Sequence, residues 1–326
     1  MQAIIRVIPA RKPVVVLAWL TFLAGGGGMG VSYLYLASAH PLDVMAGAAG
    51  FVAGAVLAAS GLIASALQRP ISLEEPTATE FSLAPPLDVG RWLAHFRRNQ
   101  QNRPEPAWDA PLALPAEIVR AVVRSLEQFQ LGDGGGPAYL IAHNRERFLA
   151  AHEGTRELVD LWFAEEREHA RLLGAAVARF GGRCIESHWS FTVFCGVRKW
   201  FGVRFELTVL LLTEIVSTVY YRLLHRHGQD PALRAMCRLI MRDESGHVAF
   251  HRDRLARAAR AGQAHHGKLW EARFRGLGFA AATMLWVNHA PGLKALGATR
   301  AEFYREIWLE LSRFVRRLHR QSQAQP

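Results

Sequence analysis

Two short motifs of the sequence combine a carboxylate and an imidazole at a fixed spacing. Both have the form Glu-x-x-His, one at Glu166–His169 and the other at Glu244–His247. Positions three apart lie on one face of a helix, so each motif can aim both groups at one point. Two such helices, with one carboxylate from each of two further helices, can enclose a pair of iron or manganese ions. The other two carboxylates must therefore come from helices of their own.

The predicted helix over residues 205–227 contains one of these carboxylates. Between Leu207 and Tyr221 the only charged residue is Glu214. A lone carboxylate in an apolar run is costly to bury unless it is paired or bound to a metal. We therefore predict that Glu214 is a metal ligand.

The first predicted helix, after Pro115, offers two candidates for the remaining carboxylate. Its apolar face is formed by Ile118, Val122, Leu126 and Phe129. Continuing this face by four residues from Phe129 leads to Asp133, which we prefer. Glu127 lies off the face and is the alternative. The predicted metal ligands are Asp133, Glu166, His169, Glu214, Glu244 and His247.

The two motif helices place their Glu and His residues in apolar stripes. We assign Glu165 to the polar side of its helix, with Arg167 and Glu168, and we place Asp243 beside the ligand face. Four carboxylates largely neutralise two divalent ions, and one imidazole per ion suits iron or manganese. Zinc would favour fewer carboxylates and more His or Cys.

The elements that must position these groups are helices. The pattern predicts an all-α, ferritin-like four-helix bundle with extra C-terminal helices, because we find no strand alternation. Gly181-Gly182 and Gly228 are helix-ending signals. After the first helix, a second one runs to about Phe180. The later predicted segments are an irregular or short-helical crossing at 183–203 and helices at 205–227, 231–261, 268–289 and 299–321.

The N-terminal part predicts a two-helix transmembrane hairpin over residues 1–69. Residues 14–37 and 44–67 carry no charge, and each is long enough to cross a membrane. Small residues spaced by four, Gly26 with Gly30 and Gly50 with Gly54, favour close packing in lipid. Basic residues outside both ends place the hairpin in the inner (cytoplasmic) membrane, with the rest of the chain in the cytoplasm.

Residues 70–114 are rich in proline and predict a linker, and residues 115–326 predict the bundle. One amphipathic stretch of the linker, 89–98, is predicted as a helix at the membrane surface. The net charge of +11 and the even spread of basic residues favour a solvated or lipid-facing surface over nucleic-acid binding. The three cysteines form no CxxC pair, which fits a reducing compartment.

The order carboxylate, Glu-x-x-His, carboxylate, Glu-x-x-His resembles the ferritin-like di-iron carboxylate superfamily. That group includes the ribonucleotide reductase small subunit, acyl-carrier-protein desaturases, bacterial monooxygenase hydroxylases and aminoaryl N-oxygenases. The resemblance covers about residues 115–262 and implies a cofactor of two Fe ions, or Mn/Fe. It implies that Asp243 orients His169 through the far ring nitrogen. It also implies that Thr218, with Ser217 beside it, is a proton-relay group, although a hydroxyl bonded back to its own helix is the commoner reading.

Two departures from the family limit what carries over. The reductase radical tyrosine corresponds to Leu173, so no stable tyrosyl radical is expected there. The extra histidine of the aminoaryl N-oxygenases corresponds to Ile240, so His251 is not that ligand and is expected to be a core or supporting histidine.

We therefore expect a membrane-anchored, non-haem di-iron oxidoreductase that activates O2. Its partners would be membrane lipid, an unidentified electron donor and a substrate that the hairpin suggests is lipid-soluble. The alternatives are a ferroxidase or peroxide-scavenging protein, and a non-catalytic membrane-anchored interaction module.

Overall fold

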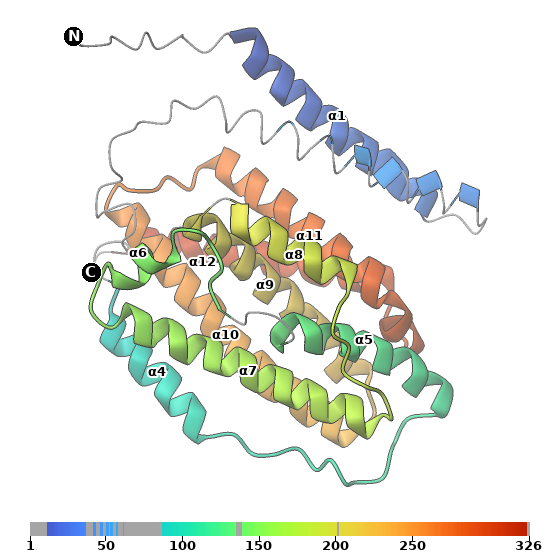
Figure 1. Cartoon of the computed structure of the whole chain (residues 1–326). Helices are drawn as coiled ribbons and strands as arrows, with labels where there is room; N and C mark the ends of the chain where they lie inside the picture. Colours follow the sequence, from blue (N-terminus) through green and yellow to red (C-terminus); the bar gives the residue numbers. More distant parts are fainter. Residues whose placement is uncertain are drawn as a thin grey trace. The chain divides into compact units, whose positions relative to one another are not determined.

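The computed structural model describes residues 12–36, scattered residues between 42 and 61, and residues 87–134, 139–200 and 202–324. Every regular element among them is a helix, which confirms the predicted all-α class (Figure 1). Two compact units divide the chain, Met1–Glu75 and Pro76–Pro326. The helices are α1 (Lys12–Leu36), α4 (Val89–Gln101), α5 (Ala116–Gly134), α6 (Arg145–Ala150), α7 (Thr155–Arg179), α8 (Trp189–Trp200), α9 (Val203–His227), α10 (Pro231–Arg260), α11 (Lys268–Ala295) and α12 (Arg300–Gln323).

Within the second unit, the four helices that carry the predicted ligands pack in pairs. α5 packs along α7, α9 packs along α10, and α7 also contacts α10. α11 and α12 cover α9 from outside this group, where α11 also contacts α5 and α12 also contacts α10. The arrangement encloses the inward faces of the four ligand-bearing helices.

Local signals fix the ends of these helices close to the predicted bounds. Asp230 caps α10 by accepting a hydrogen bond from the backbone N–H of Leu233, and Pro231 occupies the first turn. Gly181 follows α7 with φ 74°, a left-handed conformation that favours glycine. α11 continues through Pro291 to Ala295, beyond the predicted end at residue 289.

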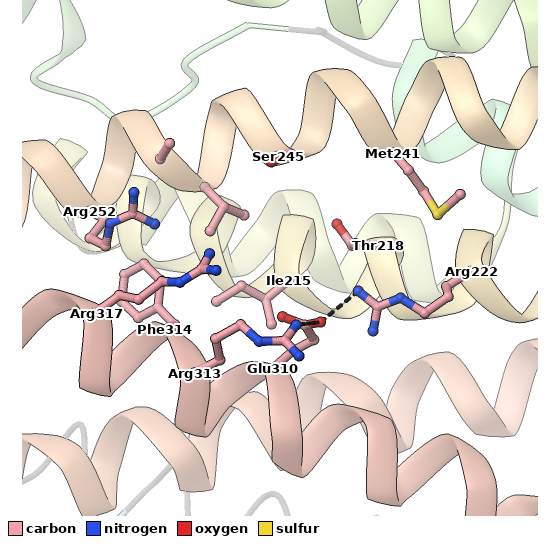
Figure 2. Close-up of a pocket in the computed structure, with 12 residues that line it drawn as sticks. Ile215, Thr218, Arg222, Met241, Ser245, Arg252, Glu310, Arg313, Phe314 and Arg317 are labelled. Carbon is pink, nitrogen blue, oxygen red and sulfur yellow. Dashed lines mark hydrogen bonds and ion pairs between the residues drawn. The ribbon is translucent and has the colours of Figure 1, made fainter.

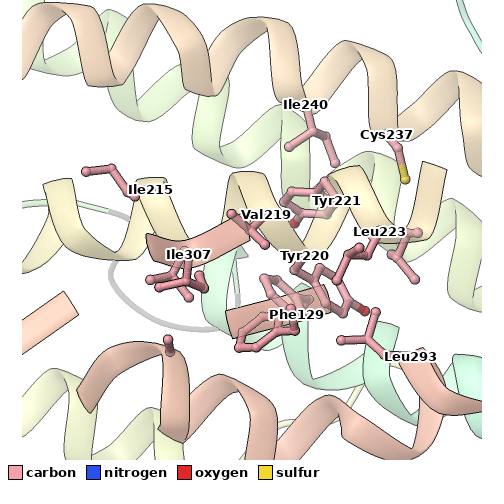
Figure 3. Close-up of a cluster of buried hydrophobic side chains, with 14 of the residues drawn as sticks. Phe129, Ile215, Val219, Tyr220, Tyr221, Leu223, Cys237, Ile240, Leu293 and Ile307 are labelled. Atoms are coloured by element: carbon pink, nitrogen blue, oxygen red, sulfur yellow. The ribbon is translucent and has the colours of Figure 1, made fainter. Parts of the chain in front are cut away.

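The main hydrophobic core surrounds α9. Figure 3 shows Val219, Tyr220 and Leu223 of α9 among residues of α5, α10, α11 and α12. The Phe129 ring stacks on Tyr220 at a centroid distance of 4.0 Å. Among the described helices α9 alone is long and apolar enough to cross a membrane, but 72% of its apolar window is buried inside the protein. α9 is therefore explained as a core helix.

Helix α4 covers the helix predicted at 89–98 and packs against the bundle, and its place at a membrane surface stays a prediction. It packs along α7, with Trp92 and Phe96 buried. The Trp92 indole N–H donates to Asp253 of α10 at 3.1 Å. Gly246 of α10 permits this approach, because a Cβ there would lie 2.5 Å from Nε2 of His95. The compact unit thus begins well before the predicted boundary at residue 115.

The first unit agrees in part with the predicted hairpin. α1 covers the first predicted crossing, whereas most of the second, 44–67, lies outside the described residues. Gly47, Gly50 and Gly54 are helical and lie against α1. A Cβ on Gly47 would lie 2.8 Å from the Ser32 carbonyl oxygen, and one on Gly54 would lie 2.7 Å from that of Gly25. Glycine therefore allows the close approach of these backbones.

The α1 side of this contact differs from the prediction. Gly26 and Gly30 are exposed and have no atom of the described chain near the place of an added Cβ. Gly25 is buried instead, and Gly28 faces Gly54. Gly50 and Gly54 therefore make the predicted contact, whereas the contacting glycines of α1 are Gly25 and Gly28, three residues apart, and not Gly26 and Gly30.

Candidate metal centre

Six side chains from four helices converge in the interior of the bundle. Asp133 of α5 lies with Glu166 and His169 of α7, and one ligand atom from each of the three is within 4.8 Å of the others. Glu166 also belongs to a second triad of this kind, with Glu214 of α9 and His247 of α10. Glu166 therefore stands between two potential metal positions and could bridge them.

Glu244 of α10 lies beside the second triad. Its Oε2 lies 3.7 Å from Nδ1 of His247, and its Oε1 accepts a hydrogen bond from the Ser217 hydroxyl at 3.1 Å. The structure thus brings all six predicted ligands to one region. That they bind a metal stays a prediction.

Several inward atoms of these groups lack hydrogen bonds. Nδ1 of His169 and Nδ1 of His247 lie 3.7 Å and 3.1 Å from the Glu166 carboxylate without an aligned hydrogen bond. Oε2 of both Glu214 and Glu244 is also buried without a hydrogen-bond partner among the described residues. Buried polar atoms normally form hydrogen bonds, so a group of buried nitrogen and oxygen atoms that lack them requires an explanation. Their chemistry, imidazole nitrogen and carboxylate oxygen, is that of ligands for two divalent cations.

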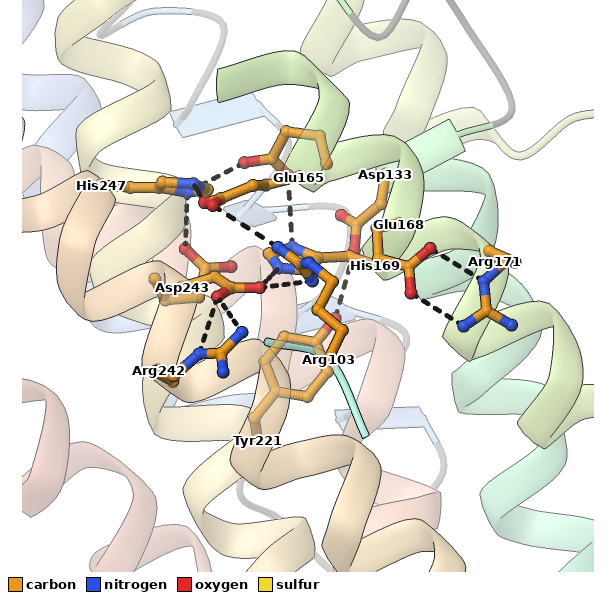
Figure 4. A network of polar contacts seen from close by, with 12 residues as sticks. Arg103, Asp133, Glu165, Glu168, His169, Arg171, Tyr221, Arg242, Asp243 and His247 are labelled. Atoms are coloured by element: carbon orange, nitrogen blue, oxygen red, sulfur yellow. Dashed lines mark hydrogen bonds and ion pairs between the residues drawn. The ribbon is translucent and has the colours of Figure 1, made fainter. Parts of the chain in front are cut away.

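The far nitrogens of the two histidines are held by carboxylates from the opposite helix (Figure 4). Nε2 of His169 lies 3.1 Å from Asp243 of α10, and Nε2 of His247 lies 2.9 Å from Glu165 of α7. Each Glu-x-x-His motif is thus preceded by an acid that orients the histidine of the other motif. This leaves both Nδ1 atoms directed at the carboxylate cluster, and such support raises ligand basicity.

Glu165 was assigned to the polar side of its helix, and that assignment is wrong. Its side chain is buried because it reaches across to His247. The repeated position directly before each Glu-x-x-His, occupied by Glu165 and Asp243, was the available signal.

Arg103 joins these two outer carboxylates and was missed by the sequence reasoning. Its guanidinium forms ion pairs with Asp243 at 2.8 Å and with Glu165 at 3.5 Å (Figure 4). Arg242 anchors this segment by donating to the carbonyl of Asn102 at 2.6 Å. Arg103 lies in the predicted linker, twelve residues before the first predicted ligand helix begins, so no local periodicity connects it with the site.

Burial and mutual repulsion govern the carboxyl groups. Burial raises the pKa of Asp133, of Glu214 and of Glu244, and neighbouring carboxylates raise each further. Burial opposes ionisation of Glu166 too, but its contacts with His169 and His247 outweigh this and lower its pKa. Such crowding of acidic groups favours cations in the space between them.

The two histidines respond in the opposite sense to burial. Burial alone would lower the pKa of His169, but Asp243 and Glu166 outweigh it and raise that pKa well above the ordinary value. The same balance, with Glu165 and Glu166 as the partners, raises the pKa of His247. Divalent cations would take the place of these protons, since an imidazole must be neutral to coordinate a metal.

The predicted alternatives on α5 are separated by the structure. Asp133 accepts a hydrogen bond from the Tyr221 hydroxyl at 3.2 Å and lies in the first triad. Glu127 instead accepts from the backbone N–H of Arg183 at 3.1 Å, outside both triads. Asp133 is therefore the α5 carboxylate that the structure brings to the cluster, and its binding of a metal stays a prediction.

Three further side chains around Glu214 have distinct surroundings. The Thr218 hydroxyl donates to the Glu214 carbonyl at 2.7 Å, and its side chain lines a pocket between α9, α10 and α12 (Figure 2). Its role as a proton relay stays a prediction, whereas Ser217 contacts Glu244 directly. His251 is buried, with Nε2 3.7 Å from Oε2 of Glu214. Burial and the positive charge of Arg254 lower its pKa, which suits a neutral supporting histidine.

Comparison with known proteins identifies no relative. No protein-family model, no curated protein and no solved structure matches this chain.

Proposed function

We propose that the chain is a membrane-anchored, non-haem di-iron oxidoreductase of the ferritin-like type, with iron or a manganese–iron pair as cofactor. The observation that carries the proposal is the sharing of Glu166 between two triads of ligand atoms. A carboxylate placed in this way is suited to hold two ions, and the inward atoms around it meet opposite charges without aligned hydrogen bonds, which favours metal ligation over an ordinary buried salt bridge. When bound, the metal pair would supply the reduction of O2.

The residues around the cluster would have different roles in holding the metals. Asp133, Glu166 and His169 would hold one ion, and Glu166, Glu214 and His247 would hold the other, with Glu244 beside the second position. Glu165 and Asp243 orient the imidazoles, and Arg103 holds both of these acids in place. The rings of Trp162 and Phe96 each lie 5.9 Å from the His247 ring, centroid to centroid. These apolar side chains would limit the access of water to the site.

The membrane anchor belongs to the same proposal. The support from α1 is its length alone: it has 25 residues, and at about 1.5 Å per residue a helix of this length exceeds a hydrocarbon core of roughly 30 Å. The close contacts of Gly47, Gly50 and Gly54 with α1 support a hairpin. A hairpin of this kind in the cytoplasmic membrane would bring the site near a lipid-soluble substrate or electron donor.

The test is metal analysis of the full chain purified with its hairpin. We expect a transition-metal pair per chain by mass spectrometry, and its loss in the Glu166→Ala, Glu244→Ala double variant. Glu168→Ala is the matched control, because Glu168 lies on α7 but pairs with Arg171 outside the cluster. Unchanged metal content in the double variant would refute the site.

A second measurement separates the proposed activity from iron handling. An oxidoreductase consumes O2 in proportion to its reductant or organic substrate. A ferroxidase would oxidise added Fe(II) well beyond the capacity of the site, with no organic product.

A further inference from the structure

A pocket lies between α9, α10 and α12, the last of which supplies none of the proposed metal ligands. Its volume is about 260 Å³. Small-ligand pockets commonly measure roughly 300–1,000 Å³, so this one suits a small molecule rather than a whole lipid. Ile215 and Thr218 line it from α9, Met241 and Val248 from α10, and Phe314 from α12 (Figure 2).

The inner lining of the pocket is largely apolar. Ile215, Met241, Val248 and Phe314 contribute hydrocarbon, a thioether and an aromatic ring. The Thr218 hydroxyl is already bonded to its own helix, so it offers little to a polar ligand. The surface thus favours an apolar group of limited length.

The rim of the pocket is cationic. Four arginines line it, Arg222, Arg252, Arg313 and Arg317, with a single acid, Glu310. Arg222 pairs with Glu306 and Glu310, and Arg313 pairs with Glu310. These two arginines are therefore neutralised within the protein.

Arg252 and Arg317 are not neutralised in this way. Nε of Arg252 donates to the neutral side chain of Gln321 at 3.0 Å. Within the described part of the chain, Arg317 has no ion pair or hydrogen bond. Burial and then the positive charge of Arg317 lower the pKa of Arg252, and the neighbouring Asp253 carboxylate only partly offsets this. An anion between Arg252 and Arg317 would offset their like charges.

From this combination we infer that the pocket binds a medium-chain fatty carboxylate. The carboxylate would lie between Arg252 and Arg317, whose planar guanidinium groups match its two oxygens. The hydrocarbon chain would lie against Ile215, Met241 and Phe314. The proposal concerns a site separate from the metal cluster, and it holds whether or not the cluster binds iron.

The experiment is photolabelling of the full chain with decanoate that carries a diazirine in its tail. The protein is reconstituted in nanodiscs of a neutral lipid, and labelled peptides are located by mass spectrometry. We expect labels on α9, α10 and α12 peptides that line the pocket. Unlabelled decanoate should suppress them, whereas decanol and inorganic phosphate at equal concentration should not.

Two variants and a control sharpen the test. The Arg252→Gln, Arg317→Gln double variant should reduce labelling of these peptides on the order of tenfold or more, because charge-assisted hydrogen bonds are lost. Ser245→Leu, which fills the pocket from an exposed position of α10, should reduce it with both arginines intact. Arg316→Gln removes an exposed arginine of α12 that does not line the pocket and should change nothing.

Three results would overturn the inference. Labelling that persists in the double variant would show that the arginines do not bind the ligand. Suppression by decanol equal to that by decanoate would show simple partitioning, and suppression by phosphate would show an anion site with no preference for a chain. Circular dichroism of each variant, expected to match the unchanged protein, excludes loss of folding as the cause.

Discussion

Two neighbouring tyrosines of α9 reach two different buried polar clusters. The Tyr220 hydroxyl lies 2.6 Å from Ser125 of α5, whose oxygen lies 2.8 Å from Nδ1 of His289 on α11. The Tyr221 hydroxyl donates to Asp133 in the carboxylate cluster. One cluster consists of three groups that are neutral at pH 7, and the other contains four carboxyl groups and two imidazoles.

The clusters differ in how completely their polar groups are satisfied by hydrogen bonds within the cluster. The Tyr220, Ser125 and His289 groups exchange hydrogen bonds, and burial lowers the pKa of His289 to about 3, so the network stays uncharged. The carboxylate cluster leaves inward nitrogen and oxygen atoms without hydrogen-bond partners among the described residues and gathers like charges. A satisfied neutral network serves stability, whereas an unsatisfied charged one indicates a ligand.

The largest expected effect is on metal content. Glu166→Ala should remove both ions, because this carboxylate belongs to both triads. Glu214→Ala should remove mainly the ion beside His247, and Ser125→Ala in the neutral network should remove neither. Mass spectrometry of metal per chain measures all three. Equal metal loss in the Glu166 and Ser125 variants would break the distinction between the clusters.

The outer carboxylates should have the next largest effect. Asp243→Asn should weaken binding of the ion near His169, and Glu165→Gln should weaken binding of the ion near His247. Each acid orients the histidine of the other motif. Loss of such support typically lowers metal affinity about 10–100-fold. Competition with a chelator of known affinity measures this, and Glu168→Gln serves as the control on α7. If both variants weakened binding of the same ion, the pairing of each acid with the histidine of the other motif would be contradicted.

In the neutral network, Ser125→Ala should affect stability alone. The change leaves the buried Tyr220 hydroxyl and His289 Nδ1 without their shared partner. An unsatisfied buried group costs about 1–3 kcal/mol. Chemical unfolding followed by circular dichroism should show the loss, and metal content should stay unchanged.

The sequence predicted the helices and the six inward side chains because both depend on local spacing. Helix ends at Gly228 and Pro231 and the two Glu-x-x-His motifs need no knowledge of distant residues. Asp133 was placed by extending one apolar face of α5, and the structure brings it to Glu166 and His169.

The outer groups were harder to predict because they depend on contacts between helices. Glu165 follows the polar pattern of its own helix and is buried only because α10 presents His247 to it. Arg103 reaches the site from a segment after α4, where Arg179 donates to the carbonyls of Trp108 and Ala110 and holds the chain against the bundle. Neither contact has a periodic signature.

A further effect is expected on the pH dependence of stability. His289 has a pKa of about 3 in the folded protein against an ordinary value of 6.5, so the unfolded chain binds its proton more readily between these values. Stability should therefore fall as the pH falls below about 6.5, by up to about 1.4 kcal/mol per pH unit. His289→Asn keeps a polar group near Ser125 and should flatten this slope between pH 6 and about 4. Unfolding free energies at several pH values measure it, and an unchanged slope would show that His289 is not responsible.

The smallest expected effect comes from Thr218, and it tests how far the metal cluster extends along α9. Its hydroxyl is bonded to the Glu214 carbonyl, whereas the hydroxyl of Ser217 contacts the Glu244 carboxylate. Thr218→Val keeps the side-chain shape and should leave metal content and O2 consumption within about twofold, because back-bonded hydroxyls contribute little to a helix. Ser217→Ala should change metal content and O2 consumption more than Thr218→Val does, since it removes a hydrogen bond to the proposed ligand Glu244. A large loss of O2 consumption in Thr218→Val with metal retained would instead support the predicted proton relay and extend the cluster to the pocket side of α9.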